Sequence, residues 1–531
     1  MKSFFTSNFN IMITKYRFLS IFLCLSFLMS CVKSPEEVLP GDDDKEVEEP
    51  PKVEEPDEEE MPDIFETAHF FTAPTALDTV TFEGASSADI NNLMQQLSQN
   101  GGSVIRIPQG QYLWEDIILK SNIHLVFESG VVVKPEHSTT RRIFNLGGDG
   151  GGDNGRIENV SIAALDERFT VDMNDAAYSN EKILVCRIGR INNFSISGFN
   201  IRDRRSAVAS ICLVFVGNTS ERSPFPTNGA ITDISQTNAH TGYGLIQCYS
   251  ADHVLFRQLD CEGGVTLRME TDDRVMKDEI KFGEKEGGIH DIFAYDIKCS
   301  KGIGPVMFSP HFTTNGEVTI QKVEATACAF AVRVEHGFIE VFDKDSQFPT
   351  NDDANRVLFK QFIENQFDLP EGVSATSGNP YKRNNGQQWA VRLSAEGSMA
   401  SRNAYISAQL GNLQAGSFLT SSVRDIKAIY GSFGAKIKQN QLAYIPCDQW
   451  SKIKNPTTSL GMPNGFEYHG PSMSLSINNT NGTAIGGNYA VFLYQESMEG
   501  FPANHLQHIK HDTPLQCTDA PNTITEYVAS F

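Results

Sequence analysis

Short runs of β-branched and other apolar residues recur through the middle of the chain, and a polar residue precedes each run. The runs begin at Asn122-Ile123, Asn159-Val160, Asn193-Phe194, Asp233-Ile234, His253-Val254, Asp291-Ile292 and Glu317-Val318. Their intervals of 37, 34, 40, 20, 38 and 26 residues correspond to one or two turns of a solenoid with loops of variable length. The pattern therefore predicts an all-β coil of short stacked strands, a parallel β-helix.

The start of this coil carries its own signals. Residues 88–99 have the apolar spacing of a helix, and Asn100-Gly101-Gly102, a sequence that ends helices, follows them. Residues 103–135 contain short β-rich runs separated by Gly, Pro and Asn turns. We therefore expect a helix that caps the N-terminal end of the coil.

The periodicity weakens after Phe342, and this divides the rest of the chain. We expect residues 64–342 to form the main part of the coil and residues 343–420 to form an inserted, partly helical, lid-like region. A strand-like run returns at 421–437 and predicts a final rung. Residues 438–531 are rich in turns and predict a small C-terminal lobe.

The N-terminus reads as a signal peptide followed by a tether. A basic segment precedes an apolar run, Phe18 to Met29, that is too short to span a bilayer as a helix. The run ends in LMSC, with the cysteine at Cys31, and this resembles a bacterial lipobox, whose cysteine becomes lipidated. An ordinary secretory signal with an incidental cysteine is the alternative. We expect residues 1–31 to be the signal and the protein to be a lipoprotein of the outer membrane or cell surface.

The charge is concentrated behind this signal. The 531-residue chain has a formal net charge of −22, and residues 32–63 alone hold 15 acidic residues against three lysines. Such a segment, interrupted by prolines, is expected to be an extended, solvated spacer. The negative charge argues against a nucleic-acid-binding protein, but a folded body without the spacer can still contain a basic cleft.

Six cysteines fall in or beside the β-rich runs: Cys186, Cys212, Cys248, Cys261, Cys299 and Cys328. We interpret them as small apolar residues stacked in the coil rather than as disulfides or metal ligands. The chain has no CxxC pair, which argues against a zinc site. Cys447 and Cys517 lie in the predicted lobe and could pair in an exported protein.

One segment, CEGGVTLRMETDD from Cys261 to Asp273, concentrates candidate catalytic groups. In a strand, alternate side chains share a face, so Arg268, Glu270 and Asp272 are expected to point the same way. Residues two apart in a strand have Cα atoms ~6.6 Å apart, close to the ~6.5–9.5 Å between the carboxyl groups of inverting glycosidases. A solvated strand face with an Arg–Glu pair is the alternative.

Three longer strings resemble a known family. GGVTLRMETDDRVMKD, GGIHDIFAYDIKCSKGIGPVMFSPHFTTNGEV and AFAVRVEHGFIEVF closely resemble the iota-carrageenases of glycoside hydrolase family 82. The resemblance runs from about Phe82 to Asn478 and is strongest over 261–342. It implies a right-handed parallel β-helix with an inserted lid and a C-terminal lobe. It also implies endo-acting, inverting hydrolysis of the β-1,4 bonds of iota-carrageenan, a sulfated galactan.

The resemblance assigns roles by position. Glu270 matches the general acid and Asp272 the base that activates water, while Gln247 and His311 match residues that line the active centre. A general acid must hold its proton near neutral pH, so we expect burial or the nearby Asp272 to raise the pKa of Glu270.

Arg268, Arg333 and Arg392 match family arginines that bind sulfate groups, and Glu340 matches an acid of the lid region that shapes the cleft or holds an arginine. A guanidinium suits this task because it stays charged and offers a planar fork of donors. We expect a monomer with no organic cofactor; a structural calcium is compatible with the carbonyl-rich turns, without assigned ligands.

Two other functions fit the same residues. The chain could be a different β-helix polysaccharide hydrolase or a lyase, although the NTD, DD, GHG and RIK strings of pectin hydrolases are not found as a set. It could also be a catalytically inactive surface lipoprotein that binds sulfated glycan. The intact pair of Glu270 and Asp272 favours an enzyme.

Overall fold

The computed structural model describes residues 61–148, 155–175, 182–240, 242–281, 285–335 and 337–342, and then shorter stretches. These stretches are 361, 365, 369, 371–375, 381–382, 389–395, 399–411, 413–430, 435–438, 453–454, 465–468, 474–476, 491–501 and 508–509. The predicted signal, Cys31, nearly all of the tether, Cys447 and Cys517 lie outside the described residues. Within them, no helix combines the length and apolar character that a membrane span requires.

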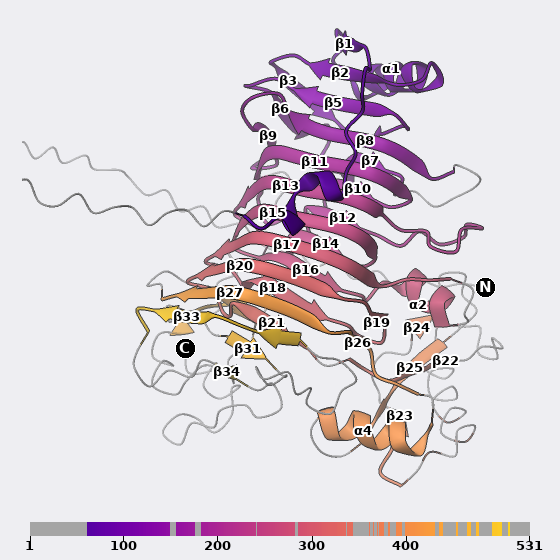
Figure 1. The fold of residues 1–531 in the computed structure, drawn as a ribbon, viewed down its shortest axis with the longest axis vertical. Coiled ribbons are helices and arrows are strands. Elements are labelled where there is room, and N and C mark those ends of the chain that lie inside the picture. The colour runs from indigo at the N-terminus through magenta and orange to yellow at the C-terminus, as the bar shows by residue number, and fades with distance from the viewer. Residues whose placement is uncertain are drawn as a thin grey trace, which may run out of the picture. The chain divides into compact units, whose positions relative to one another are not determined.

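Two long parallel sheets form the coil (Figure 1). Along the first sheet the strand order is β1 (Thr79–Thr81), β2 (Ser103–Ile107), β5 (Ile123–Phe127), β8 (Ile157–Ala164), β11 (Ile191–Arg202), β13 (Thr227–Thr237), β15 (Ala251–Glu262), β17 (Ile289–Ser300), β20 (Val318–Thr326), β27 (Ser421–Ile429) and β32 (Val491–Leu493). Four further strands join it at the side: β3 (Gln111–Trp114), β6 (Val132–Pro135), β9 (Phe169–Asp172) and β33 (Glu496–Glu499).

The second sheet alternates with the first along the chain. Its order is β4 (Ile117–Ile118), β7 (Arg142–Leu146), β10 (Leu184–Ile188), β12 (Ile211–Leu213), β14 (Gly244–Cys248), β16 (Val265–Glu270), β18 (Gly304–Ser309), β21 (Val332–Val334), β31 (Ser474–Ser476) and β34 (His508–Ile509). Because each turn of the chain adds one strand to each sheet, the structure is a parallel β-helix, and the predicted right-handed parallel β-helix is confirmed.

The remaining elements are short. The helices are η1 (Asp63–Phe65), η2 (Thr67–His69), α1 (Ser87–Gln99), α2 (Arg274–Lys281) and α4 (Met399–Gln409). The short sheets pair β19 (Thr314–Asn315) with β26 (Ser417–Phe418), β25 (Trp389–Ser394) with β22 (Glu340–Phe342), β23 (Ser374–Ala375) and β24 (Tyr381–Lys382), and β30 (Gly465–Tyr468) with β28 (Ala435–Lys438) and β29 (Ile453–Lys454).

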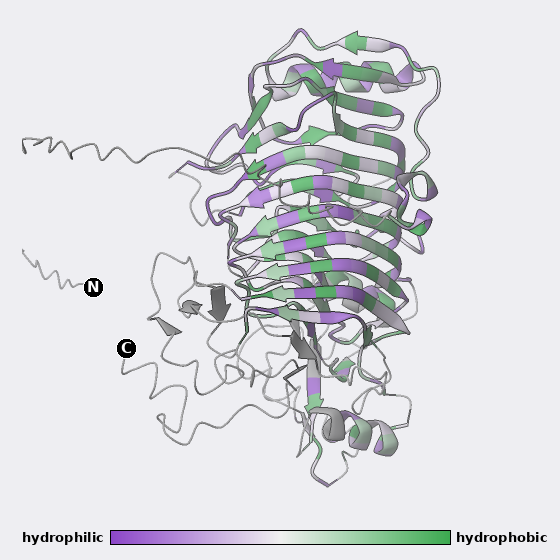
Figure 2. Ribbon diagram, turned by 60° about the vertical axis from the view of Figure 1, so that its left-hand side comes forward, coloured by the Kyte–Doolittle hydropathy of each residue, from purple (hydrophilic) through white to green (hydrophobic). Residues whose placement is uncertain are grey.

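The core consists of side chains stacked in register from rung to rung. One row of fully buried residues crosses the first sheet: Leu125, Ile162, Ile196, Ile231, Phe256, Ala294, Ile320 and Val423. Along the strands, hydrophobic and hydrophilic residues alternate (Figure 2). The buried rows explain why β-rich runs recur along the sequence.

Polar residues mark the bends of the coil. Asn122, Asn159 and Asn193 adopt the left-handed backbone conformation, with φ of 63°, 58° and 55°, which Asn tolerates better than most residues. Their amides form a ladder, in which Asn159 Nδ2 donates to Asn122 Oδ1 and Asn193 Nδ2 to Asn159 Oδ1, each at 2.8 Å. The polar residues predicted before each run therefore have a physical reason.

The predicted repeat is wrong at one place. Asp233 belongs to a second bend, because the pairing of β13 with β15 sets it opposite Gln258 rather than His253. Asn228 takes the first bend in that strand. Glu317 precedes β20 in register with Asp291, as the repeat predicts, although it is not left-handed. The interval of 20 residues between Asp233 and His253 is short because these two residues belong to different bends.

Helix α1 caps the coil as predicted. Ser86 is its N-cap and forms a capping box with Asp89. The helix buries Ile90 and Met94 over the first rungs. Gly102, with φ of 104°, then brings the chain so close to Asn122 that a Cβ would lie 2.3 Å from its carbonyl oxygen, so this turn requires glycine.

Two predicted boundaries need correction. The described body begins at Met61, within the predicted tether, and Phe65 is fully buried against residues of the first sheet. The run at 421–437 is not the last rung, because β32 and β33 pair with β27, and β28 joins a different sheet.

The six described cysteines are buried, as predicted. Five of them belong to the main core. Cys212 instead faces outward from the second sheet, where it packs with Val214 and Val216 in a separate apolar cluster. Burial raises the pKa of its thiol to about 12.

Candidate active site

At the end of strand β16 successive side chains lie on opposite faces, as the alternation predicts. Leu267, Met269 and Thr271 are fully buried on the inner side. The side chains of Arg268, Glu270 and Asp272 are 11%, 16% and 37% exposed. The chain stays extended past the strand because Thr271 N donates to Ser309 O and its hydroxyl to Pro310 O. Two carboxyl groups and a guanidinium therefore share one outer face.

His311 joins the two carboxyl groups. Its Nε2 lies 3.3 Å from Glu270 Oε1, and its Nδ1 lies 3.5 Å from Asp272 Oδ1. His311 follows β18 in the left-handed conformation, with φ of 48°, which is unusual outside glycine. Its carbonyl accepts from Phe338 N. The ring thus stands between the proposed acid and the proposed base, and both contacts are made by one side chain.

Glu270 is ionised in this arrangement, and the expectation of a raised pKa is wrong. Burial raises the pKa of its carboxyl group, but Arg268 and His311 outweigh burial and lower it to about 2. Arg268 Nη2 lies 2.9 Å from Oε1 and 2.7 Å from Oε2 of Glu270, and its Nη1 donates to Gly242 O. The sequence places the guanidinium near the acid but does not reveal that it grips both oxygens.

Gln247 lies beside Arg268 on the neighbouring strand. It is 2% exposed, and its amide donates to the backbone carbonyl of Glu270 at 3.1 Å. Gln247 therefore supports the strand that carries Glu270, and it lies beside Arg268 and Glu270.

Arg333 lies two strands from Arg268, with Met307 between them in register. Its side chain is 8% exposed and forms an ion pair with Glu335. Burial raises the pKa of Glu335, but Arg333 and the Ser309 hydroxyl outweigh it, so the pKa is lowered. Arg333 is thus held by a carboxylate of its own.

Arg392 and Glu340 lie opposite each other in the antiparallel pair β22 and β25. Arg392 Nε is 3.0 Å from Glu340 Oε1, and the Glu340 side chain is 0% exposed. The Arg392 guanidinium stacks 3.8 Å from the centre of the Phe338 ring, and Phe338 also contacts His311, with ring centres 5.6 Å apart. Glu340 therefore holds an arginine, one of the two roles expected of it, and this pair is linked to the site through Phe338.

Sequence reasoning missed Glu335 and Tyr249. Glu335 repeats the arrangement of Glu270, since each glutamate follows an arginine by two residues and Ser309 lies between them. This R-x-E spacing was visible in the sequence. Tyr249 follows β14, and burial raises the pKa of its hydroxyl, as do the neighbouring Cys212 and Glu270. Nothing in the sequence marks a single tyrosine for this place.

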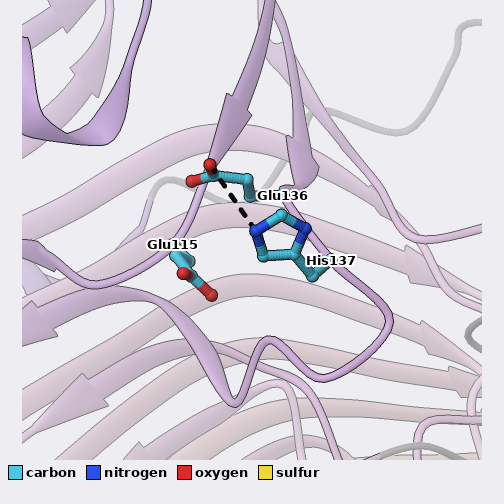
Figure 3. A group of neighbouring side chains, drawn as sticks. All are labelled: Glu115, Glu136 and His137. Atoms are coloured by element: carbon cyan, nitrogen blue, oxygen red, sulfur yellow. Dashed lines mark ion pairs between the residues drawn. The ribbon is translucent and has the colours of Figure 1, made fainter.

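Among the described residues, one group has metal-ligand chemistry: Glu115, Glu136 and His137 (Figure 3). Ser87 donates to Glu136 and Thr140 to Glu115, and the His137 side chain is 59% exposed. The group lies on the first rungs, away from β16. Since calcium favours sites made of oxygen ligands, two partly engaged carboxylates and an imidazole do not support the expected calcium at this position.

Comparison with known proteins found clear relatives, although no family model matches the chain. The chain is 40% identical over 445 residues to an iota-carrageenase of Zobellia galactanivorans, which covers 83% of this chain and 84% of that protein. A crystal structure of a family GH82 iota-carrageenase from A. fortis matches with a TM-score of 0.70 and 30% identity over 87% of this chain and 94% of that one. An iota-carrageenase complexed to iota-carrageenan fragments matches with a TM-score of 0.69 and 30% identity over 87% and 96%.

Proposed function

The chain belongs to the iota-carrageenase family, glycoside hydrolase family 82, and on this premise we propose that it hydrolyses iota-carrageenan internally at its β-1,4 bonds, with inversion. It is a glycoside hydrolase. One observation carries the assignment of its chemistry to particular residues: His311 contacts Glu270 and Asp272 with its two ring nitrogens, at the exposed end of one strand.

In the proposed reaction Glu270 protonates the glycosidic oxygen of the leaving sugar. Asp272 accepts a proton from a water molecule, and this water attacks the anomeric carbon from the opposite side. Asp272 suits the base because it is more exposed than Glu270, and water reaches it more easily. His311 holds the two carboxyl groups in place, and Gln247 supports the backbone of Glu270. No organic cofactor takes part.

The spacing of the carboxyl groups supports inversion. They belong to residues two apart in an extended chain, and an imidazole ring stands between them. A retaining enzyme requires carboxyl groups only ~5–5.5 Å apart, whereas an inverting enzyme leaves room for water between them. An intervening ring is compatible with the wider spacing.

The acid role requires a change in the partner of Glu270. A general acid must carry a proton, but the ion pair with Arg268 keeps Glu270 ionised. An ester sulfate of the bound polysaccharide offers Arg268 a competing anion. Drawing the guanidinium away from Glu270 removes one of the two groups that together outweigh burial, and this shifts the carboxyl group toward the protonated form.

The test is incubation with pure iota-, kappa- and lambda-carrageenans, followed by product sizing and anomeric NMR. We expect rapid chain shortening of the iota form, with the α-anomer as the first product. Glu270→Gln should lower the rate by ~10²-fold or more. The β-anomer as the first product would contradict the roles given to the two carboxyl groups.

The same assay separates the alternatives. A lyase would give desaturated products that absorb in the ultraviolet, and another hydrolase would prefer a different polysaccharide. A binding protein without activity would release no reducing ends, and Glu270→Gln would not change that result.

The site of action follows from the N-terminus. Cys31 as a lipidated residue would hold the enzyme at the cell envelope, with the acidic segment 32–63 as spacer. Cys31→Ser should then release the protein from the membrane fraction, which fractionation and immunoblotting measure. Retention of this variant in the membrane would contradict the lipid anchor.

A further inference from the structure

The three arginines expected to bind sulfate share one property: a glutamate already engages each of them. The pairs are Arg268 with Glu270, Arg333 with Glu335, and Arg392 with Glu340. An ester sulfate must compete with a carboxylate at every one of these positions. An arginine on the same face that is held in place without a carboxylate would bind sulfate more readily.

Arg187 is such a residue. It lies on β10 in the same cross-strand row as Arg268, since Arg187 pairs with Cys212, Cys212 with Gln247 and Gln247 with Arg268. Three strand spacings separate the backbones of Arg187 and Arg268, which corresponds to ~14 Å at ~4.8 Å per spacing. A polysaccharide that extends along the coil axis from Glu270 toward the N-terminal rungs would pass over Arg187.

The side chain of Arg187 is fixed at its stem. Its Nε donates to Gly148 O at 2.7 Å. The stem also crosses Gly148 so closely that a Cβ there would lie 2.5 Å from Cγ and 2.9 Å from Cδ of Arg187. Glycine at position 148 therefore makes room for the arginine, and the backbone carbonyl orients the guanidinium. Within the described part of the chain, neither Nη group has a hydrogen-bond partner.

No carboxylate of the described residues lies within ion-pair distance of Arg187. Asp273 is the acidic group that senses its charge: burial raises the pKa of Asp273, and Arg187 counteracts this. Asp273 itself accepts from Met276 N at the start of α2, at 2.8 Å. The charge of Arg187 thus has no ion-pair partner among the described residues, which is the state in which a guanidinium binds an external anion well.

The surface between Arg187 and Glu270 suits a sugar chain. An apolar cluster, formed by Cys212, Val214 and Val216 and covered in part by Tyr243 and Tyr249, occupies the outer face of β12 and its surroundings. Ligand sites typically combine such apolar and aromatic surface with a few placed polar groups. On this surface Arg187 is the polar group at the end away from Glu270.

We propose that Arg187 forms a distal subsite that binds an ester sulfate of the polysaccharide, about three strands from the acid Glu270, and that Gly148 is its support. This inference rests on the proposed function for the identity of the substrate. The guanidinium presents its two Nη groups to two sulfate oxygens in the bidentate geometry that arginine forms with oxyanions.

The test measures binding apart from cleavage. In the Glu270→Gln background, calorimetry gives Kd for size-fractionated iota-carrageenan oligosaccharides of increasing length. We expect Arg187→Gln to weaken binding of long oligosaccharides by about 10- to 100-fold, the effect of one lost hydrogen-bonded charge, and to leave the shortest ones unchanged. Gly148→Ala should weaken the same long ligands, because it displaces the stem while it keeps the charge.

Arg202→Gln is the matched control. Arg202 lies on β11 of the first sheet, 56% exposed, and removing it changes the net charge equally. It should leave binding at every length unchanged, and thermal unfolding should show that all variants fold. Equal losses of affinity for Arg187→Gln and Arg202→Gln would show that the effect comes from net charge alone, and this would overturn the proposal.

Two further outcomes are distinguishable. If Arg187→Gln binds long oligosaccharides as tightly as its parent, or weakens all lengths equally, the distal subsite is wrong even when the parent enzyme cleaves iota-carrageenan. If the parent does not cleave iota-carrageenan but long ligands bind through Arg187, the proposed catalytic function is wrong and the distal subsite is supported.

Discussion

The ion pair between Arg268 and Glu270 makes a quantitative prediction for Arg268→Met. Glu270 has a pKa of about 2 against an ordinary value of 4.5, which corresponds to about 3 kcal/mol of stabilisation of the folded state at neutral pH. The variant loses the part of this stabilisation that Arg268 supplies, and it keeps the burial that raises the pKa and the His311 contact that lowers it. We therefore expect its free energy of unfolding at pH 7 to fall by about 3 kcal/mol or more, as for other broken buried pairs.

The pH dependence distinguishes this cause from lost packing. In the parent the carboxyl group has a lowered pKa, so its stabilisation is complete above about pH 4.5 and disappears as the pH falls toward 2. In the variant Arg268 no longer lowers the pKa, so the carboxyl group takes up its proton at a higher pH than in the parent. The difference between the two proteins should therefore be largest at pH 7 and shrink steadily toward pH 3.

Urea unfolding at pH 7, 5.5, 4 and 3 measures this difference, and carbon NMR of the Glu270 carboxyl group gives its pKa directly. A double-mutant cycle with Glu270→Gln isolates the pair, because Arg268→Met should cost much less once the carboxylate is gone. A destabilisation that stays the same from pH 7 to pH 3 would refute the reasoning, since packing losses do not titrate.

Four further outcomes follow from the structure. Glu335→Gln should destabilise the protein by about 3 kcal/mol in urea unfolding, because the buried Arg333 loses its partner; a change below 1 kcal/mol would contradict this. Asp272→Asn should lower the hydrolysis rate by ~10²-fold while thermal unfolding stays close to the parent's, and near-normal reducing-sugar release would contradict its role as base. Cys212 should resist thiol reagents at pH 8 until urea unfolds the protein, because burial raises its pKa to about 12; rapid labelling of the native protein would show the thiol to be accessible. Asn159→Ala should cost ~1–2 kcal/mol because of the left-handed backbone, and Asn159→Gly should cost less; equal losses would point to the amide ladder instead.

Recurring β-rich runs were sufficient to predict the coil, and period-two alternation was sufficient to predict the face of β16. A strand buried on one side permits only one orientation, so the sharing of one face by Arg268, Glu270 and Asp272 follows from their spacing alone. The capping helix was equally predictable, because its cap and its glycines are local signals.

Partnerships across rungs were not predictable in this way. Arg268 reaches Gly242, 26 residues earlier, and His311 reaches Glu270, 41 residues earlier. Which groups meet depends on loop lengths between strands, and these vary from rung to rung. For the same reason Asp233 was assigned to the wrong bend. Arg268 was visible two residues from Glu270, but the close ion pair that lets it outweigh burial together with His311 was not.

Strands held in register within the coil are less free to change in sequence than segments that leave it. Side chains of strands such as β14 and β16 are tied in register to a stack of buried residues, so altering one strand disturbs its neighbours on both sides. Segments that leave the stack, such as α2 and the sheet formed by β22 and β25, make few demands on that register. During evolution, α2 and the sheet of β22 and β25 can therefore change to admit new glycans while strands β14 and β16 stay the same.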